Sequence, residues 1–219
     1  MIKGKDLKNK LISDLNNEFS KLGFQFEKTQ EWFRKNHDDI SHFYKLDFYT
    51  TSGGYRVQPV LCVRSEKLHL MYHKISGIKQ ADQKYHSAIN TTVWRLYRNR
   101  SDGEFILTSE MELKSVGQSI LNIFNKTALP FFDQCSSIAD IDRMFNTNPD
   151  EQLSRQYNLN DFPRCCYATI AAKIVENPNY SDLVQAYRSF LKTYRKGKFL
   201  DQYEKLLLIL DDVSMIEYV

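Results

Sequence analysis

Hydrophobic positions in the first part of the chain change from helical spacing to strict alternation. Five apolar side chains recur at intervals of three or four residues, and these are Leu7, Leu11, Leu15, Phe19 and Leu22. Because Gly23 follows them, the pattern predicts an amphipathic helix that ends at this glycine. The aromatic runs FQFEK and EWFRK come next, on either side of Thr29-Gln30. They predict two short strands joined by a tight turn.

The stretch YKLDFYTTSGGYRVQPVLCV, residues 44–63, alternates on both sides of Gly53-Gly54. If these glycines form a two-residue turn, Ser52 pairs with Tyr55, and an apolar residue meets an apolar residue at each step outward. The apolar face then carries Tyr44, Leu46, Phe48, Val57, Leu61 and Val63. Because Pro59 has no N–H, the second strand is predicted to lie at an edge, or to turn this nitrogen away from its neighbour.

Three more runs, KLHLMYHKI, NTTVWRLYRN and GEFILTS, are rich in β-branched and aromatic residues and predict strands. The last two flank RSDG and predict a second hairpin. We therefore expect one antiparallel sheet of about five to seven strands. From Ser109 onward the apolar spacing becomes helical again, so the second half is expected to be helical from near Met111.

The polar segment 146–160 contains NTNPDEQ and is the best candidate linker. Three apolar stripes follow it and predict three amphipathic helices. The predicted fold class is thus α+β, with an N-terminal helix, an antiparallel sheet built from hairpins and a helical C-terminal half. The predicted organisation is a sheet domain over residues 1–145, a linker over 146–160, and a three-helix extension over 161–219 that packs on the sheet domain.

Composition and charge argue against several classes of protein. The chain has 219 residues, of which 42% are hydrophobic, and a formal net charge of +3. Such a weak charge argues against a nucleic-acid partner. The polar start MIKGKDLKNK argues against a signal peptide, and no apolar stretch is long enough to span a membrane, so we expect a cytoplasmic protein. The four cysteines, Cys62, Cys135, Cys165 and Cys166, are spaced for neither zinc nor a disulfide, which predicts reduced, packed thiols and no cofactor.

Two motifs resemble those of a known family. KLGFQFEKTQEWFRK places Leu22, Gly23 and Phe24 at the end of the first helix, with Phe33 in the strand that follows. ILNIFNKTALPFFDQCSSIADI carries Pro130 after the sheet region. Over about residues 5–144 the chain resembles the bacterial family of domain of unknown function 4304. The resemblance implies a fold, and it carries no catalytic residues across.

Acidic and histidine residues cluster between two predicted strands, at His37, Asp38, Asp39 and His42. Carboxylates beside imidazoles can hold a divalent metal or transfer protons. Aspartates also favour solvated turns, which is the simpler interpretation. This group is the first candidate for a metal-dependent hydrolase.

Two other patterns could carry chemistry. Glu66, His69 and His73 form the pattern E-x-x-H-x-x-x-H, and on a helix His69 and His73 would share one face and could hold a metal ion. The alternation of LHLMYHKI predicts a strand instead, on which these two histidines lie too far apart for one ion. Asp102, Glu112 and Lys114 have the residue types of a metal-dependent nuclease. Since EMELKSVGQSI favours the start of a helix, its glutamates are better explained by the helix dipole.

A basic patch, with Tyr194 inside it, consists of Lys192, Arg195, Lys196 and Lys198. Cations beside an aromatic ring can bind phosphates. Cations before Gly197 also complement the C-terminus of a helix, and we favour that interpretation.

The sequence therefore favours a non-enzymatic protein-binding module, with a metal-dependent hydrolase or nuclease as the alternative. The expected partner is another protein, for example a toxin bound by an immunity factor. The predicted interaction face is the polar side of the central hairpin, formed by Lys45, Asp47, Tyr49, Arg56, Gln58 and Arg64. Tyrosine and arginine are enriched in protein interfaces.

Overall fold

The computed structural model describes residues 4–97, 103–149, 156–157 and 160–212. The chain divides into two compact units, and each is described by itself. The N-terminal unit comprises residues 1–63 and 90–134, and the C-terminal unit comprises residues 64–89 and 135–219. The predicted α+β class is confirmed: a helix precedes a mostly antiparallel sheet, and helices make up the C-terminal half. The predicted boundaries at 145 and 160 stay a prediction.

Six strands form one sheet in the described part of the chain. They are β1 (Gln25–Glu27), β2 (Trp32–His37), β3 (Ile40–Thr51), β4 (Gly54–Ser65), β5 (Ile89–Thr92) and β6 (Phe105–Leu107). The order is β1-β2-β3-β4-β5, and β6 also pairs with β4. Phe33 lies opposite Tyr44 in the antiparallel β2–β3 pair, and Arg56 lies opposite Ile106 in the antiparallel β4–β6 pair.

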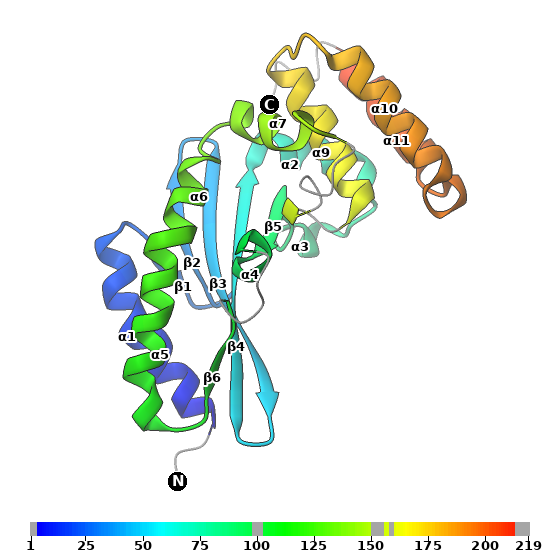
Figure 1. The fold of residues 1–219 in the computed structure, drawn as a ribbon. Helices are drawn as coiled ribbons and strands as arrows, with labels where there is room; N and C mark the ends of the chain where they lie inside the picture. The colour runs from blue at the N-terminus through cyan, green and yellow to red at the C-terminus, as the bar shows by residue number, and fades with distance from the viewer. Residues whose placement is uncertain (1–3, 98–102, 150–155, 158–159, 213–219) are drawn as a thin grey trace. The chain divides into compact units, whose positions relative to one another are not determined.

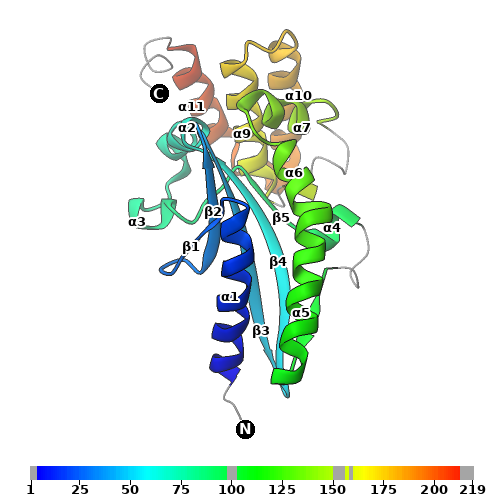
Figure 2. The same cartoon turned by 90° about the vertical axis from the view of Figure 1, so that its left-hand side faces the viewer.

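Helices α1 (Gly4–Lys21) and α5 (Glu110–Ile123) lie side by side against one face of the sheet (Figures 1 and 2). The N-terminal unit also contains α4 (Val93–Tyr97), a π-helical turn at Phe124–Ala128 and α6 (Leu129–Asp133). The ring of Phe19 lies 4.6 Å from that of Phe33 and 4.5 Å from that of Phe124. The predicted apolar stripe of the first helix therefore packs on the sheet, with Leu11 and Phe19 completely buried.

The central hairpin is confirmed, but its turn begins one residue earlier than predicted. Strand β3 ends at Thr51 and β4 begins at Gly54, so the two-residue loop is Ser52-Gly53. This loop places Thr51 opposite Gly54, which moves the pairing by two residues and leaves every side chain on its predicted face. The Arg56 guanidinium lies 4.7 Å from the Tyr49 ring centroid, which agrees with this pairing.

Strand β4 is not an edge strand, which corrects one alternative of the prediction. Its first half pairs with β6, through Tyr55–Leu107, Arg56–Ile106 and Val57–Phe105, and it also neighbours β3 and β5. Pro59 comes two residues after the last of these β6 pairs. The predicted second hairpin is also wrong, because β6 pairs with β4 rather than with the preceding run, NTTVWRLYRN. That run forms only the short β5 before it turns into α4.

The C-terminal unit is helical. Its helices are α2 (Glu66–Ser76), α3 (Gln80–Gln83), α7 (Ile138–Asn146), α9 (Asp161–Ile174), α10 (Tyr180–Thr193) and α11 (Leu200–Asp211). The three predicted C-terminal helices are confirmed as α9, α10 and α11. Helix α9 packs against α2, α7, α10 and α11, and it is buried almost continuously from Phe162 to Ala172. A single apolar stripe is therefore the wrong description of α9, which is the core of this unit.

A buried hydrogen-bond network connects three of these helices. The Asn146 side-chain amide donates to an Asp142 carboxylate oxygen at 2.6 Å and to the Ala168 carbonyl at 2.9 Å. The Tyr187 hydroxyl donates to the Asn146 amide oxygen at 2.6 Å. Because each buried polar group in it has a partner, the network fixes α7 against α9 and α10.

The strand predicted over KLHLMYHKI is wrong, because this segment forms α2. The Ser65 hydroxyl caps the helix by accepting from the Leu68 amide at 3.2 Å, and Gly77 ends it in the left-handed conformation. Burial follows the helical period rather than alternation, since Leu68 and Tyr72 are buried and Leu70 is 52% exposed.

Cys62, Cys135, Cys165 and Cys166 are all buried and free. Burial raises the pKa of the Cys166 thiol, and the neighbouring Cys165 adds to this effect. The Cys166 thiol is therefore protonated at neutral pH. Within the described ranges, no helix is long and apolar enough to cross a membrane.

Candidate functional site

The polar face of the hairpin is only partly available to a partner. Tyr49 is 41% exposed, and it stacks with Arg56, whose guanidinium also lies 3.7 Å from the Glu104 carboxylate. Gln58 was expected on the exposed face, but it is only 8% exposed and its amide contacts Glu104 at 3.4 Å. Strand β6, which the sequence did not place beside β4, explains this burial.

The remaining residues of the predicted interaction face form local ion pairs. Lys45 pairs with Asp47 at 2.6 Å. Arg64 belongs to the C-terminal unit and pairs with Glu66 at 2.8 Å. Next to these ion pairs, a row of side chains crosses three strands: Tyr49, the partly exposed Arg56, and Ile106, which is 56% exposed.

The acidic and histidine cluster does not form a metal site. His37 and Asp38 belong to an exposed turn, where their side chains are 62% and 94% exposed and 3.6 Å apart. Asp38 has a φ of 49°, a left-handed turn conformation that aspartate tolerates. His42 is buried instead, stacked on the Phe132 ring at 4.7 Å. Among the described residues, no three histidine, cysteine or acidic side chains are placed to hold a metal ion.

The nuclease-like pattern also has a structural explanation. Asp102 lies outside the described residues. The Glu112 carboxylate accepts hydrogen bonds from the Thr108 amide at 2.6 Å and from the Ser109 amide at 3.1 Å, and Ser109 completes a capping box. Hydrogen bonds from Thr108 first, and then from Ser109, lower the pKa of Glu112. Lys114 is exposed on α5. These residues start a helix, as the sequence predicted.

Helix α2 brings together the two histidines that the predicted strand kept apart. The rings of His69 and His73 are 4.1 Å apart, and His86 lies 5.7 Å from His73. Burial lowers the pKa of His69 to about 3, and the nearby Arg64 adds to the effect. Burial, followed by His86 and Arg64, lowers the pKa of His73 to about 4. These imidazoles are therefore neutral at pH 7.

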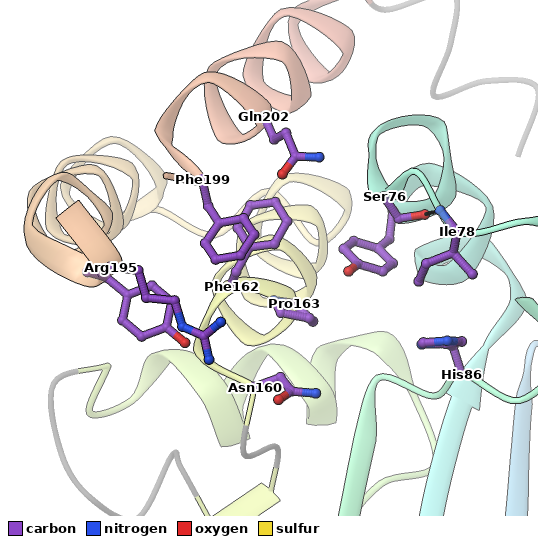
Figure 3. Close-up of a pocket in the computed structure, with 11 residues that line it drawn as sticks. Ser76, Ile78, His86, Asn160, Phe162, Pro163, Arg195, Phe199 and Gln202 are labelled. Carbon is purple, nitrogen blue, oxygen red and sulfur yellow. Dashed lines mark hydrogen bonds between the residues drawn. The ribbon is translucent and has the colours of Figure 1, made fainter. Parts of the chain in front are cut away.

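A pocket of about 300 Å³ lies next to these histidines, within the C-terminal unit (Figure 3). Its lining comes from α2, the loop after it, the start of α9, the turn after α10 and the start of α11. The lining residues are Tyr72, Ser76, Ile78, His86, Asn160, Phe162, Pro163, Tyr194, Arg195, Phe199 and Gln202. None of the eleven is acidic, and five carry aromatic or imidazole rings. The volume is at the lower end of the range for small-molecule sites.

Hydrogen bonds hold two sides of the pocket in place. The Ser76 hydroxyl contacts the His73 ring nitrogen Nδ1 at 2.8 Å and accepts from the Ile78 amide at 3.2 Å. The Gln202 side-chain amide donates to the Ile75 carbonyl at 3.3 Å, which ties α11 to α2. The pocket is therefore formed by fixed elements of the unit.

One wall of the pocket is a column of near-parallel rings. The rings of Phe162 and Phe199 stack at 4.7 Å with an interplanar angle of 13°. Tyr194 continues the column 6.1 Å from Phe199, and Phe190 lies 5.4 Å beyond Tyr194. Figure 3 shows Phe162 and Phe199 between Arg195 on one side and His86 on the other. An aromatic wall thus lies beside a guanidinium group.

Arg195 is positioned by a strained turn. Arg195 has a φ of 46° and Lys196 a φ of 59°, and Gly197 follows with a φ of 75°. Consecutive left-handed residues cost about 1–2 kcal/mol each when they carry a side chain. Strain of this kind accumulates at functional sites, where the surrounding structure maintains it. The predicted helix end at Gly197 is corrected by this turn, because α10 ends at Thr193.

Replacing Lys196 by glycine is expected to raise the free energy of unfolding by about 1 kcal/mol, because glycine adopts a left-handed φ without strain. Urea denaturation would measure the change. Lys198→Gly is the matched control, since Lys198 has a right-handed φ of −47° and glycine there should give no gain. Equal effects of the two substitutions would contradict the strain at residue 196.

Sequence reasoning missed this pocket, although one signal pointed to it. The basic patch around Tyr194 was interpreted as a helix cap, and two of its members, Tyr194 and Arg195, line the pocket instead. Searches with this chain match no family model, no curated protein and no solved structure. The resemblance to the family of domain of unknown function 4304 therefore stays a prediction.

Proposed function

We propose that this protein is a non-enzymatic binding module and that the pocket of its C-terminal unit is the ligand site. The observation that carries the proposal is the pocket wall, where Phe162 and Phe199 present a stacked aromatic surface beside Arg195. Ligand sites combine apolar and aromatic walls with a few polar groups in this way. The candidate catalytic groups have other roles: Glu112 caps α5, and His37 with Asp38 forms an exposed turn.

The test is a binding measurement with single-ring probes. Ligand-observed NMR with benzoate, benzamide and benzylamine would show which probes bind. Ile78→Trp places a larger side chain at the pocket lining and is expected to weaken the tightest probe at least about tenfold, a loss of about 1.4 kcal/mol. Leu70→Trp is the control, because Leu70 lies on α2 outside the lining and is 52% exposed. Binding that Ile78→Trp leaves unchanged, with both variants folded, would contradict the proposal.

A second candidate function, recognition of another protein, is favoured by the exposed row of Tyr49, Arg56 and Ile106. The row combines an aromatic ring, a guanidinium stacked on it at 4.7 Å and an exposed aliphatic side chain. Tyr and Arg are the residue types that dominate interface energetics. The partner of this candidate is a protein, and its site is independent of the pocket residues.

The double substitution Tyr49→Ala and Arg56→Ala is expected to weaken partner retention about tenfold while changing stability by less than about 1 kcal/mol. The measurement is a quantitative pull-down against the source-cell proteome, followed by thermal denaturation of each variant. Tyr85→Ala is the control, because Tyr85 is 53% exposed and lies in the other unit. If the unsubstituted protein, the double variant and Tyr85→Ala retain a partner equally well, this face is not the protein-binding site.

A further inference from the structure

The positive charge of the pocket lining comes from Arg195, on one side of the pocket. The lining contains one arginine and no acidic residue. Arg195 forms no ion pair within the described part of the chain, and its guanidinium lies 5.5 Å from the Tyr194 ring. Lys198 adds a second positive charge close by, 5.7 Å from the Phe199 ring. A negatively charged ligand would therefore meet attraction and no repulsion from the lining.

The side facing Arg195 is polar and uncharged at neutral pH. Burial, together with Arg64, lowers the pKa of His86, whereas Asp82 acts in the opposite direction. The neutral His86 imidazole can form a hydrogen bond to a ligand, and Ser76 and Asn160 add polar atoms without net charge. These groups can orient a ligand whose charge lies at Arg195.

We infer that the pocket binds a small planar anion, namely a single aromatic ring that carries a carboxylate or phosphate group. The ligand ring packs against the aromatic wall that contains Phe162 and Phe199, because aromatic rings favour edge-to-face and offset contacts. The acidic group meets the Arg195 guanidinium, which binds both carboxylate and phosphate in a bidentate geometry. This inference rests on the proposed function and adds the chemical class of the ligand.

The strained turn fits this assignment. Two residues with side chains, Arg195 and Lys196, adopt left-handed conformations immediately before Gly197. The turn holds the Arg195 backbone at the pocket, whereas Lys196, its neighbour with the same backbone conformation, does not line the pocket. The two residues therefore provide a matched pair for a test: their charge and backbone conformation are alike, and only one contributes to the lining.

The experiment compares benzoate, phenyl phosphate and benzamide by calorimetric titration of the full chain. Benzamide keeps the ring and lacks the charge. Because hydrogen bonds to charged groups are stronger than those between neutral groups, at least one anion should bind at least tenfold more tightly than benzamide. Arg195→Gln should remove this difference, and Lys196→Gln should preserve it.

The outcomes separate the inference from the proposed function. Equal affinities for the anions and benzamide, with binding lost in Ile78→Trp, would overturn the inference and leave the pocket as a ligand site. A preference for anions that survives Arg195→Gln would also overturn the inference. Absence of binding by all three probes would overturn both.

Discussion

Replacing Gly54 by alanine is expected to lower the free energy of unfolding by about 3 kcal/mol. A Cβ atom at residue 54 would lie 2.2 Å from the Leu107 carbonyl oxygen and 2.8 Å from the Thr108 Cα atom. Both neighbours are backbone atoms, and Leu107 is fixed by its pairing with Tyr55. Strand β6 therefore has to move away from β4, which breaks the hydrogen bonds that hold it.

Gly53→Ala is the matched control for this substitution. The nearest atom to a Cβ at residue 53 is the Thr108 side-chain methyl group at 3.8 Å, which is an ordinary contact. We expect a change within about 0.5 kcal/mol. Chemical denaturation of both variants measures the difference. Equal losses at the two glycines would contradict the position of β6 against the hairpin.

Lowering the pH from 7 to 4.5 is expected to destabilise the protein by about 2 kcal/mol through His69 and His73. Their pKa values in the folded protein, about 3 and about 4, lie below the value of about 6.5 in an unfolded chain. The unfolded state therefore binds more protons in this range, and stability falls as the pH drops below about 6.5. This destabilisation of about 2 kcal/mol is about half of what the two pKa shifts alone would give, because solvent screens the partly exposed His73.

Several charged groups surround these histidines and belong to the same effect. Arg64 and His86 oppose protonation of both, and Asp82 acts on His86 in the opposite direction. Denaturation curves between pH 7 and 4.5 measure the slope. The double variant His69→Gln and His73→Gln should have a flatter profile, whereas His37→Gln, which removes an exposed imidazole, should keep the original slope. If the stability of the double variant still falls steeply between pH 7 and 4.5, groups other than His69 and His73 cause the pH dependence.

The sequence predicted those parts of the fold in which side-chain periodicity is decisive. The hairpin faces are correct even though the loop is Ser52-Gly53 rather than Gly53-Gly54. The loop moves by one residue, so the pairing moves by two, and a side-chain period of two leaves the faces unchanged. The start of the helix at EMELKSVGQSI was also predicted correctly, and the structure adds that Ser109 and Glu112 form a capping box there.

Helix α2 shows where periodicity misleads. LHLMYHKI alternates like a strand, but the Ser65 cap and the Gly77 stop are helix signals of the same sequence, and they determine the outcome. The wrong prediction also kept the two histidines apart, because only a helix brings the rings of His69 and His73 to 4.1 Å from each other. Short apolar runs fit both periods, and the flanking residues have to decide between them.

The pocket could not be predicted from the sequence. Its lining comes from chain segments far apart, around Ser76, Asn160 and Arg195, that are brought together only when α2, α9 and α11 pack. Nothing local in the sequence states which aromatic rings will stack. The sequence placed Tyr49 and Arg56 on one face but could not add Ile106 to them, because that depends on β6 pairing with β4 over a long chain separation.

The most direct test of the central claim, that the pocket is the ligand site, is amide chemical-shift mapping during titration with the tightest of the single-ring probes. We predict perturbations that saturate and that centre on Ile78, His86 and the turn at Arg195. Perturbations centred on the hairpin at Tyr49 and Arg56, or shifts that do not saturate, would contradict the claim.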